Sequence, residues 1–468
     1  MTENPLDLLP ELLVLAGAVA GLLTGSFLAR ERQRAVAWIC GLALAAALAA
    51  TGLAAGRPDG MAFGAYALDP ITHTARAVVA GSTLLVLVLA APWARGNRRE
   101  SELYALCLLA ALGSIALAGA DDLLVLVAAY LLAGVPGYAL AGFARDARGT
   151  EAALKYYLMG AFLGVLMLAG VTLLYGLSGV TAYRDLAGRL GQAPAAAVGC
   201  GLVLLLAGPL TKAGAVPAQF WVPDAAQGAS RPVAAFLTTV PKIGAFAALY
   251  RLAAEPFAGI EGWRVALALV AAATMTLGNL AAFRQDDARR LLAYSTIGQA
   301  GYILVPVAAG GPLSAPALLF YLAAYAVTNV GAFAVVVAVG RDRLADHAGL
   351  ARRAPALALA LAVCLLGLVG TPPTAVFAAK VLVIASAWES GLAWLAVLLV
   401  LNTVASLFYY LRWLTPAFRA APAAPPGPAR SLEDPGRSPR PAAGPYGVAV
   451  LAAAASVLLG VGAGLFLA

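Results

Sequence analysis

Charged residues are scarce in this sequence of 468 residues: 12% are Asp, Glu, Lys or Arg, whereas 62% are hydrophobic. Soluble domains carry about 25% charged and about half apolar residues, so this composition excludes an ordinary soluble protein. Apolar runs of about 20 residues recur from end to end, and each is long enough to cross a hydrocarbon core about 30 Å thick. We therefore expect an all-α integral membrane protein.

Cysteine and histidine are also rare, and their spacing makes a metal site unfavourable. The chain has four isolated cysteines and two histidines: Cys40, Cys107, Cys200, Cys364, His73 and His347. A CxxC motif or a Cys/His cluster is missing from the sequence, so we expect no iron–sulfur cluster, zinc site or disulfide framework, and no cofactor. A basic leader is missing too, because the first apolar run follows the acidic stretch Met1 to Glu11, which predicts a first span and not a cleaved signal.

The apolar runs predict about fourteen transmembrane helices. They lie near 8–29, 34–55, 70–93, 101–119, 121–143, 152–178, 193–213, 229–253, 262–283, 288–310, 313–340, 355–386, 388–413 and 446–467. Glycine and proline within these runs are tolerable, since neighbouring helices can satisfy the freed backbone groups.

The net charge of +8 is explained by membrane topology and not by nucleic acid. Arginines gather in alternate loops, and no basic face interleaved with aromatics forms, so we expect no nucleic-acid partner. The arginine-rich odd-numbered loops contain Arg30, Arg32, Arg34, Arg95, Arg98, Arg99, Arg145, Arg148, Arg284, Arg289, Arg290, Arg341, Arg343, Arg352, Arg353, Arg419, Arg430, Arg437 and Arg440. The alternate loops contain few arginines: Arg57, Arg184, Arg189 and Arg264. The positive-inside rule then predicts a multi-pass protein of the bacterial inner membrane with cytoplasmic odd loops and both termini outside.

Two apolar segments are interrupted by glycine and proline. Residues 208–228 read GPLTKAGAVPAQFWVPDAAQG, and residues 367–380 read GLVGTPPTAVFAAK. Paired interruptions in the two halves of a membrane protein are typical of discontinuous helices that surround an ion site between inverted repeats. Two ordinary proline kinks are the alternative.

Lysine is the rarest cation, with four residues against 27 arginines. Arginine stays charged, whereas a buried lysine can take up and release a proton. Lys212 and Lys380 lie in the interrupted segments, and Lys242 lies in the middle of its own span. Ionisable groups at membrane depth mark ion pathways, so these three lysines are expected to form a proton relay. Lys155 lies near the end of its span, where snorkelling or an ion pair explains it equally well.

Around these lysines the sequence resembles subunit N of NADH-quinone oxidoreductase, the antiporter-like membrane subunit of respiratory complex I. The resemblance covers roughly 100–413. It rests on ALKYYLMG (153–160), KAGAVPAQFWVPDAAQG (212–228), PVAAFLTTVPKIGA (232–245), RLLAYSTIGQAGY (290–302), GLARRAP (349–355), GTPPTAVFAAK (370–380) and NTVASLFYYLR (402–412).

The resemblance implies fourteen helices with two inverted five-helix repeats, each with one broken helix. It implies an N-terminal three-helix segment (1–100), a first repeat (101–253), a second repeat (254–417), a cytoplasmic Pro/Ala/Arg-rich linker (418–445) and a final helix (446–468). It also implies proton transport along Lys212, Lys242 and Lys380, coupled to electron transport and quinone reduction elsewhere in the translocase. The expected partners are other membrane subunits and the lipid bilayer. Secondary site residues are Lys155, Gln219, Asp224, Gln299 and Tyr130.

The sequence departs from the family at positions that tune the relay. Leu131 stands where the family typically has a glutamate that is thought to pair with the lysine matching Lys212, and Gln219 and Gln299 replace histidines near the channel. Without that glutamate, the Lys212 ammonium is expected to lie near water, a tyrosine such as Tyr130 or Tyr138, or an acidic group from elsewhere in the chain. The alternative functions are a subunit of a monovalent cation/proton antiporter or membrane-bound hydrogenase, and a membrane scaffold that no longer pumps.

Overall fold

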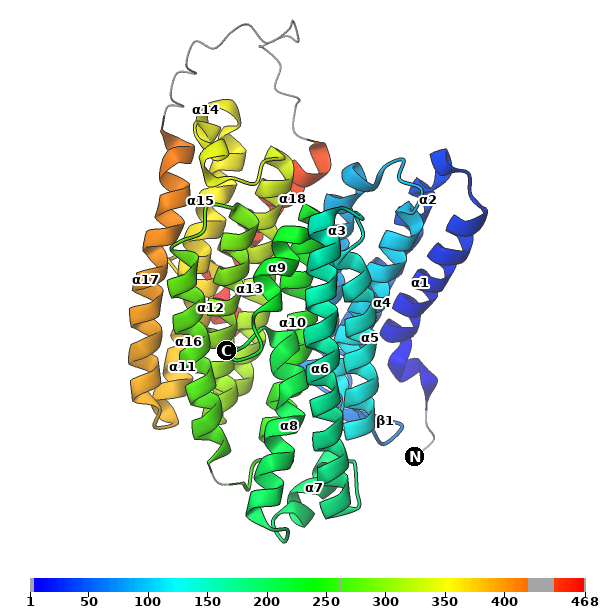
Figure 1. Cartoon of the computed structure of the whole chain (residues 1–468), viewed down its shortest axis with the longest axis vertical. Helices are drawn as coiled ribbons and strands as arrows, with labels where there is room; N and C mark the ends of the chain where they lie inside the picture. The colour runs from blue at the N-terminus through cyan, green and yellow to red at the C-terminus, as the bar shows by residue number, and fades with distance from the viewer. Residues whose placement is uncertain (1–3, 261, 420–441, 467–468) are drawn as a thin grey trace, which may run out of the picture.

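The computed structural model describes residues 4–260, 262–419 and 442–466, and it is an all-α bundle of roughly antiparallel helices (Figure 1). Within these ranges, thirteen helices are long and apolar enough to cross a membrane. A fourteenth crossing is made by two shorter helices in series, α15 and α16, so the predicted number of spans is confirmed.

Twelve crossings are single helices, and two are interrupted. The single helices are α1 (Leu9–Phe27), α2 (Arg34–Ala54), α3 (Pro70–Ala94), α4 (Glu100–Gly119), α5 (Leu123–Ala141), α6 (Ala147–Ser178), α10 (Arg231–Ala254), α11 (Trp263–Ala282), α12 (Ala288–Ala309), α13 (Ser314–Val339), α17 (Ala393–Phe418) and α18 (Ala443–Val461). The interrupted pairs are α8 (Ala195–Ala213) with α9 (Trp221–Gly228), and α15 (Pro355–Val369) with α16 (Ala375–Glu389). Both interruptions predicted from glycine and proline are therefore present.

Short elements connect the crossings. They are the 3-10 helices η1 (Pro5–Leu8), η2 (Arg30–Arg32) and η3 (Leu344–His347), the short helices α7 (Tyr183–Leu190), α14 (Leu350–Arg353) and α19 (Ala463–Phe466), and the strands β1 (Gly60–Ala62) and β2 (Tyr66–Leu68). The two strands form an antiparallel hairpin with Met61 opposite Ala67. The linker predicted over 418–445 falls almost entirely on residues 420–441, which lie outside the described residues.

Aspartate residues set where several of the crossings begin. Asp69, Asp122, Asp146 and Asp287 precede α3, α5, α6 and α12, and each side chain accepts a hydrogen bond from a backbone N–H of the first turn. These caps satisfy N–H groups that have no partner within the helix. These aspartate caps therefore help to determine where α3, α5, α6 and α12 begin.

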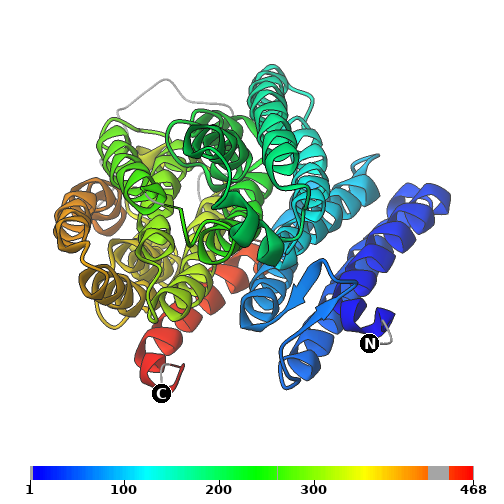
Figure 2. The same ribbon diagram turned by 90° about the horizontal axis from the view of Figure 1, so that it is seen from below.

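The core of the bundle is built from α10, α12 and α13, and the final crossing returns to it. Nearly all of α10 and α12 is buried, whereas the outer faces of α1, α2, α6 and α17 expose apolar side chains. Seen from below, the N-terminal helices form an outlying row at one edge, while α18 lies beside helices of the second half (Figure 2). Burial of α10 and α12 places Lys242 and Gln299 in the interior.

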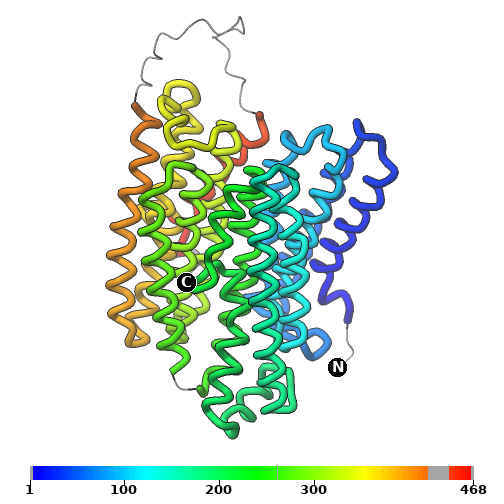
Figure 3. The backbone as a smooth tube through the Cα atoms, in the orientation of Figure 1, coloured from blue at the N-terminus to red at the C-terminus, as the bar shows by residue number. Residues whose placement is uncertain are grey.

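The two ends of the bundle differ in their connections. The hairpin β1–β2 and α7 lie at the lower end, and α14 and the connections of the arginine-rich loops lie at the upper end (Figures 1 and 3). The alternation of arginine along the sequence therefore corresponds to two distinct faces of the molecule.

Candidate functional site

Two helix interruptions lie in the interior of the bundle and leave helix ends within it. Helix α8 ends at Ala213 and is followed by Gly214, with φ of 71°; α15 ends at Val369 and is followed by Gly370, with φ of 90°. The last carbonyl groups of a helix lack partners within it and carry partial negative charge. Each interruption therefore offers acceptors for a cation at membrane depth.

Lys242 fills the first interruption from the neighbouring helix α10. Its side chain is buried, and its Nζ donates a hydrogen bond of 2.7 Å to the carbonyl of Ala213, the final residue of α8. The ring of Trp221, at the start of α9, lies 5.8 Å from the same Nζ. A Cβ at Gly214 would come within 2.3 Å of Nζ, so glycine leaves the space that the ammonium uses.

Lys380 repeats this arrangement in the second interruption. Its Nζ donates to the carbonyl of Val369, the last residue of α15, at 2.8 Å and to Oγ1 of Thr403 at 3.0 Å. The ring of Tyr302 lies 4.1 Å from Nζ, within the range of a cation–π contact. Both interruptions therefore hold a buried lysine on the carbonyl that ends the first helix.

Lys212 is held differently, although it lies in the last turn of α8. It is fully buried, and its Nζ has no hydrogen-bond partner among the described residues. The rings of Tyr130 and Tyr138 lie 5.0 Å from Nζ, and that of Tyr156 lies 5.3 Å away. The expectation of a tyrosine near this ammonium is confirmed, and the ammonium is enclosed by aromatic faces with no carboxylate bonded to it.

Leu131 is not the α5 residue that faces Lys212. Its side chain is 50% exposed on the outer surface of the chain, whereas a Cβ built on Gly134 would lie 2.8 Å from the Lys212 Nζ. Three residues along a helix turn the side-chain direction by about 300°, so Leu131 points about 60° away from the direction of Gly134, towards the outer surface. A side chain at position 131 therefore points away from the Lys212 ammonium in this chain.

Buried polar groups continue from Lys242 towards the second half. Tyr325 on α13 donates to the carbonyl of Thr238, one turn from Lys242, at 2.6 Å, and its hydroxyl also lies 3.1 Å from Oγ1 of Thr296 on α12. Asn329, one turn along α13, donates to the Thr239 hydroxyl at 2.8 Å. Hydroxyl and amide groups thus join α10 to α12 and α13.

A second set of buried polar groups reaches Lys380. Asn279 on α11 donates to the Tyr302 hydroxyl at 2.9 Å, and Tyr409 on α17 donates to the Asn279 side-chain oxygen at 3.0 Å. Tyr410, next to Tyr409, exchanges a short hydrogen bond with Ser295 of α12. Tyr302 lies against the Lys380 ammonium, so this set of polar groups extends as far as the second interruption.

The two glutamines predicted near the site both lie in the interior. Gln299 donates to the carbonyl of Leu368 at 2.8 Å and accepts from the Tyr321 hydroxyl at 2.7 Å. Gln219 lies in the first interruption, and its side-chain oxygen is buried without a hydrogen-bond partner in the described part of the chain. Each glutamine therefore lies beside one of the two breaks.

Lys155 and Asp224 form an ion pair at the upper end of the bundle. The Lys155 Nζ lies 3.0 Å from Asp224 and 2.7 Å from Glu151, and Arg290 lies 2.8 Å from the other Asp224 oxygen. The Lys155 side chain is 47% exposed, in contrast to the three buried lysines. Of the two readings of Lys155, the geometry favours the ion pair.

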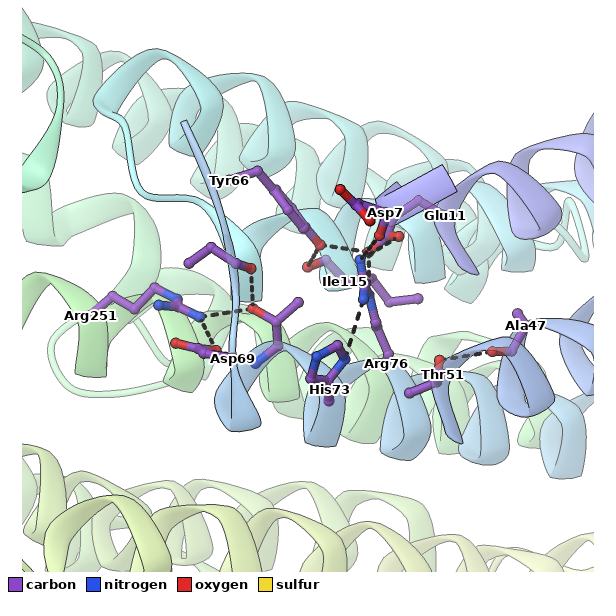
Figure 4. Close-up of polar contacts among 12 residues, drawn as sticks. Asp7, Glu11, Ala47, Thr51, Tyr66, Asp69, His73, Arg76, Ile115 and Arg251 are labelled. Atoms are coloured by element: carbon purple, nitrogen blue, oxygen red, sulfur yellow. Dashed lines mark hydrogen bonds and ion pairs between the residues drawn. The ribbon is translucent and has the colours of Figure 1, made fainter. Parts of the chain in front are cut away.

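A further buried charged cluster involves side chains of the N-terminal helices (Figure 4). Arg76 on α3 donates to both carboxylate oxygens of Glu11, at 2.7 and 2.8 Å, and Tyr66 donates to Glu11 at 2.6 Å. Sequence reasoning counted the loop arginines and missed this one. An arginine inside an apolar span was the available signal, because such a charge needs a buried partner.

Groups of three or more His, Cys, Asp or Glu residues that could hold a metal ion are not found within residues 4–260, 262–419 and 442–466. Around the two helix interruptions, the polar side chains described above are amines, hydroxyls and amides. Such groups can bind, orient and pass protons.

Comparison with known proteins agrees with this geometry. The family model described as NADH:quinone oxidoreductase/Mrp antiporter, TM, matches residues 120–406. NADH-quinone oxidoreductase subunit N 1 of Streptomyces griseus subsp. griseus is 52% identical, over 100% of this chain and 98% of that protein. Subunit N of Mycobacterium sp. (strain JLS) is 50% identical, over 98% of this chain and 97% of the relative.

Solved structures show the same fold. A chain of respiratory complex I from Thermus thermophilus with bound aureothin is similar with a TM-score of 0.83 and 35% identity, covering 98% of both chains. A chain of the Mrp complex from Dietzia sp. DQ12-45-1b also has a TM-score of 0.83, at 25% identity, covering 100% of this chain and 96% of that one.

Proposed function

The chain belongs to the NADH:quinone oxidoreductase/Mrp antiporter family of membrane subunits, and from this premise we propose that its buried lysines carry protons across the membrane. The identity of 50–52% over nearly the full length of the subunit N relatives identifies it as a subunit of an NADH-quinone oxidoreductase, a proton-translocating assembly with other membrane subunits as partners. The residues that move the proton are our proposal.

The repeated lysine arrangement is the observation that carries this proposal. Lys242 and Lys380 each donate to the carbonyl that ends a helix interrupted in the interior. Such a carbonyl holds an ammonium by a hydrogen bond and by the helix dipole, without a fixed counter-charge. The lysine can therefore release its proton without leaving a buried carboxylate unpaired, which suits a relay.

We place Lys212 at one end of the relay and Lys380 at the other, with Lys242 between them. Tyr130 and Gln219 belong to the surroundings of the first interruption, and Gln299 to those of the second. The hydroxyl and amide groups between Lys242 and Lys380 would order the water that passes the proton, as buried polar groups commonly do.

Orientation and internal repeats are part of the same proposal. We assign the arginine-rich upper face to the cytoplasm of a bacterium and the face of α7 and the β-hairpin to the outside. We also retain the division into a three-helix segment (1–100), two inverted repeats (101–253 and 254–417) and a final helix (446–468), without a cofactor in this chain. The two helix interruptions, one in each repeat, support this division.

Two other functions explain fewer features of this chain. A cation/proton antiporter subunit has the same fold, but the Mrp chain is 25% identical whereas the subunit N relatives reach 52%. A scaffold that no longer pumps would not need three buried lysines, because unpaired charges at membrane depth are costly.

Lys→Met variants of the assembled complex in sealed vesicles test the proposal. Lys212→Met, Lys242→Met and Lys380→Met should each lower the number of protons pumped per NADH oxidised. Arg284→Met, which removes a cation from an exposed loop, should leave this ratio at the wild-type value. Wild-type ratios in all three lysine variants would refute the relay.

A further inference from the structure

The outer end of α10 holds a second set of buried charges, on the same helix as Lys242. From residue 242 to residue 251 the helix rises about 13 Å, at 1.5 Å per residue. Arg251 is 3% exposed, and it donates to Asp69 at 2.7 Å, to the Thr72 hydroxyl at 2.8 Å and to the carbonyl of Ala118 at 2.5 Å (Figure 4). This arginine therefore has its partners and acts as a fixed positive charge.

Asp121, beside this arginine, does not have all its partners. It is 2% exposed, and its Oδ1 has no hydrogen-bond partner among the described residues. Its backbone is fixed from both sides, because its N–H donates to the carbonyl of Ala65 at 3.0 Å and its carbonyl accepts from the N–H of Tyr183 at 3.1 Å. A buried carboxyl group is thus held in one place with a free oxygen.

Glu255 lies against Asp121 and is open to the outside. Glu255, at the end of α10, is exposed, and it lies close enough to Asp121 for its charge to raise the pKa of the Asp121 carboxyl. Two neighbouring carboxylates repel each other, and a pair of this kind lowers the repulsion by binding one proton between them. The pair therefore consists of the buried Asp121 carboxyl group and the solvent-exposed Glu255 carboxyl group.

The other groups around the pair determine when the proton is bound. Arg251 and Arg184 lower the pKa of Asp121, whereas burial and then the charge of Glu255 raise it, to about 6 in total. Arg184 is 3.9 Å away and largely exposed, and the Tyr183 hydroxyl is buried beside the pair without a hydrogen bond among the described residues. Asp122 points elsewhere, because it caps α5 and accepts from Thr181.

We propose that Asp121 and Glu255 form a proton-binding site at the outer end of the chain, through which protons that have crossed the lysine relay are released. This inference rests on the proposed function. A proton arriving from the α10 side forms an O–H bond on Asp121, with Glu255 accepting the hydrogen bond. The O–H bond then breaks when the proton passes through Glu255 to water outside, and the pair returns to its starting charge.

Infrared difference spectra of the assembled complex between pH 5 and pH 8 test the binding site by itself. The carbonyl stretch of a protonated carboxylic acid should titrate near the pH where Asp121 is half protonated, about 6. Asp121→Asn should remove this band, and Glu255→Gln should shift its pH midpoint. Asp122→Asn is the matched control, because asparagine caps helices as well as aspartate does, and it should keep the band.

Proton release is then measured with the same variants in sealed vesicles. Asp121→Asn should lose most of the proton translocation that Lys242→Met also abolishes, whereas Asp122→Asn should retain it. A band that persists in Asp121→Asn, or a band that disappears while translocation stays at the wild-type level, would overturn the inference. Full translocation in Lys242→Met, together with Lys212→Met and Lys380→Met, would instead refute the relay, so the two failures are distinguishable.

Discussion

At the residue scale, the interior gives each buried lysine an environment with no charged partner bonded to it in the described part of the chain. Lys242 and Lys380 bond to helix-ending carbonyls, and Lys212 lies among tyrosine rings. An isolated buried charge is costly, and removing its partner from a buried pair usually costs about 3–5 kcal/mol. Neutral acceptors avoid that penalty when the lysine loses its proton.

The glycine after α8 allows a residue-scale test of this idea. Gly214→Ala should lower proton translocation, because the new Cβ would displace the Lys242 ammonium, which lies 2.3 Å from the Cβ position. Gly340→Ala is the matched control: it has the same φ of 71° but open space around its Cβ. Both variants should lose about 1–2 kcal/mol of stability to left-handed strain.

Translocation and the thermal midpoint should be measured together on both variants. Equal losses of translocation in Gly214→Ala and Gly340→Ala would show that strain, and not the displaced lysine, is responsible.

The sequence alone predicted which residues belong to the site better than it predicted which way their side chains point. Lys212, Lys242 and Lys380 stand out because each is a lysine inside an apolar run, in a chain whose loop cations are arginines. The orientation of Leu131 could not be obtained in this way, since all sides of α5 are apolar and its periodicity does not distinguish them. The sequence named Tyr130 and Tyr138 as possible neighbours of Lys212, but the contact with Tyr156 depends on packing between α5, α6 and α8, which a single sequence does not specify.

At the scale of elements, long helices and their interruptions were predictable, and short elements were not. Apolar length predicts a span, and paired glycine and proline residues predict a break. The strands Gly60–Ala62 and Tyr66–Leu68 have three residues each and the helix α7 has eight, and tertiary contacts decide such short elements. Tyr66, for example, is fixed by Glu11, 55 residues away in sequence.

The ion pair between α1 and α3 leads to a prediction about how these elements stay together. Arg76→Met should destabilise the N-terminal helices by about 3–5 kcal/mol, because Glu11 would remain buried without its partner. The double variant Glu11→Met/Arg76→Met should recover much of this loss, since no unpaired charge remains. Protease resistance of the N-terminal helices in the assembled complex is the measurement, and a double variant less stable than Arg76→Met would contradict the argument.

At the scale of the whole molecule, the uneven distribution of arginine between the two ends predicts its orientation. Cysteine introduced at Arg284, on the upper face, should react with an impermeant maleimide only from the cytoplasmic side, and cysteine at Asp59, near the β-hairpin, only from outside. Cys200 is the exposed native cysteine and would first be replaced by serine. Labelling of Arg284→Cys from outside would reverse the assignment of the two faces.

The number of crossings also belongs to this scale. Each crossing must satisfy its backbone hydrogen bonds within the membrane, so composition restricts it to a helix and makes it predictable. The linker predicted over 418–445 lies largely outside the described residues and stays a prediction.

The central claim, that the buried lysines carry protons and do more than support the helix breaks, is tested most directly by Lys→Arg substitution. Arginine keeps the positive charge and can donate to the same carbonyl, but it does not lose its proton at any accessible pH. The measurement is the number of protons translocated per NADH oxidised by the assembled complex carrying Lys242→Arg or Lys380→Arg. If the lysines carry protons, the ratio should be as low as in the corresponding Lys→Met variants; a wild-type ratio in the arginine variants would contradict the proton relay.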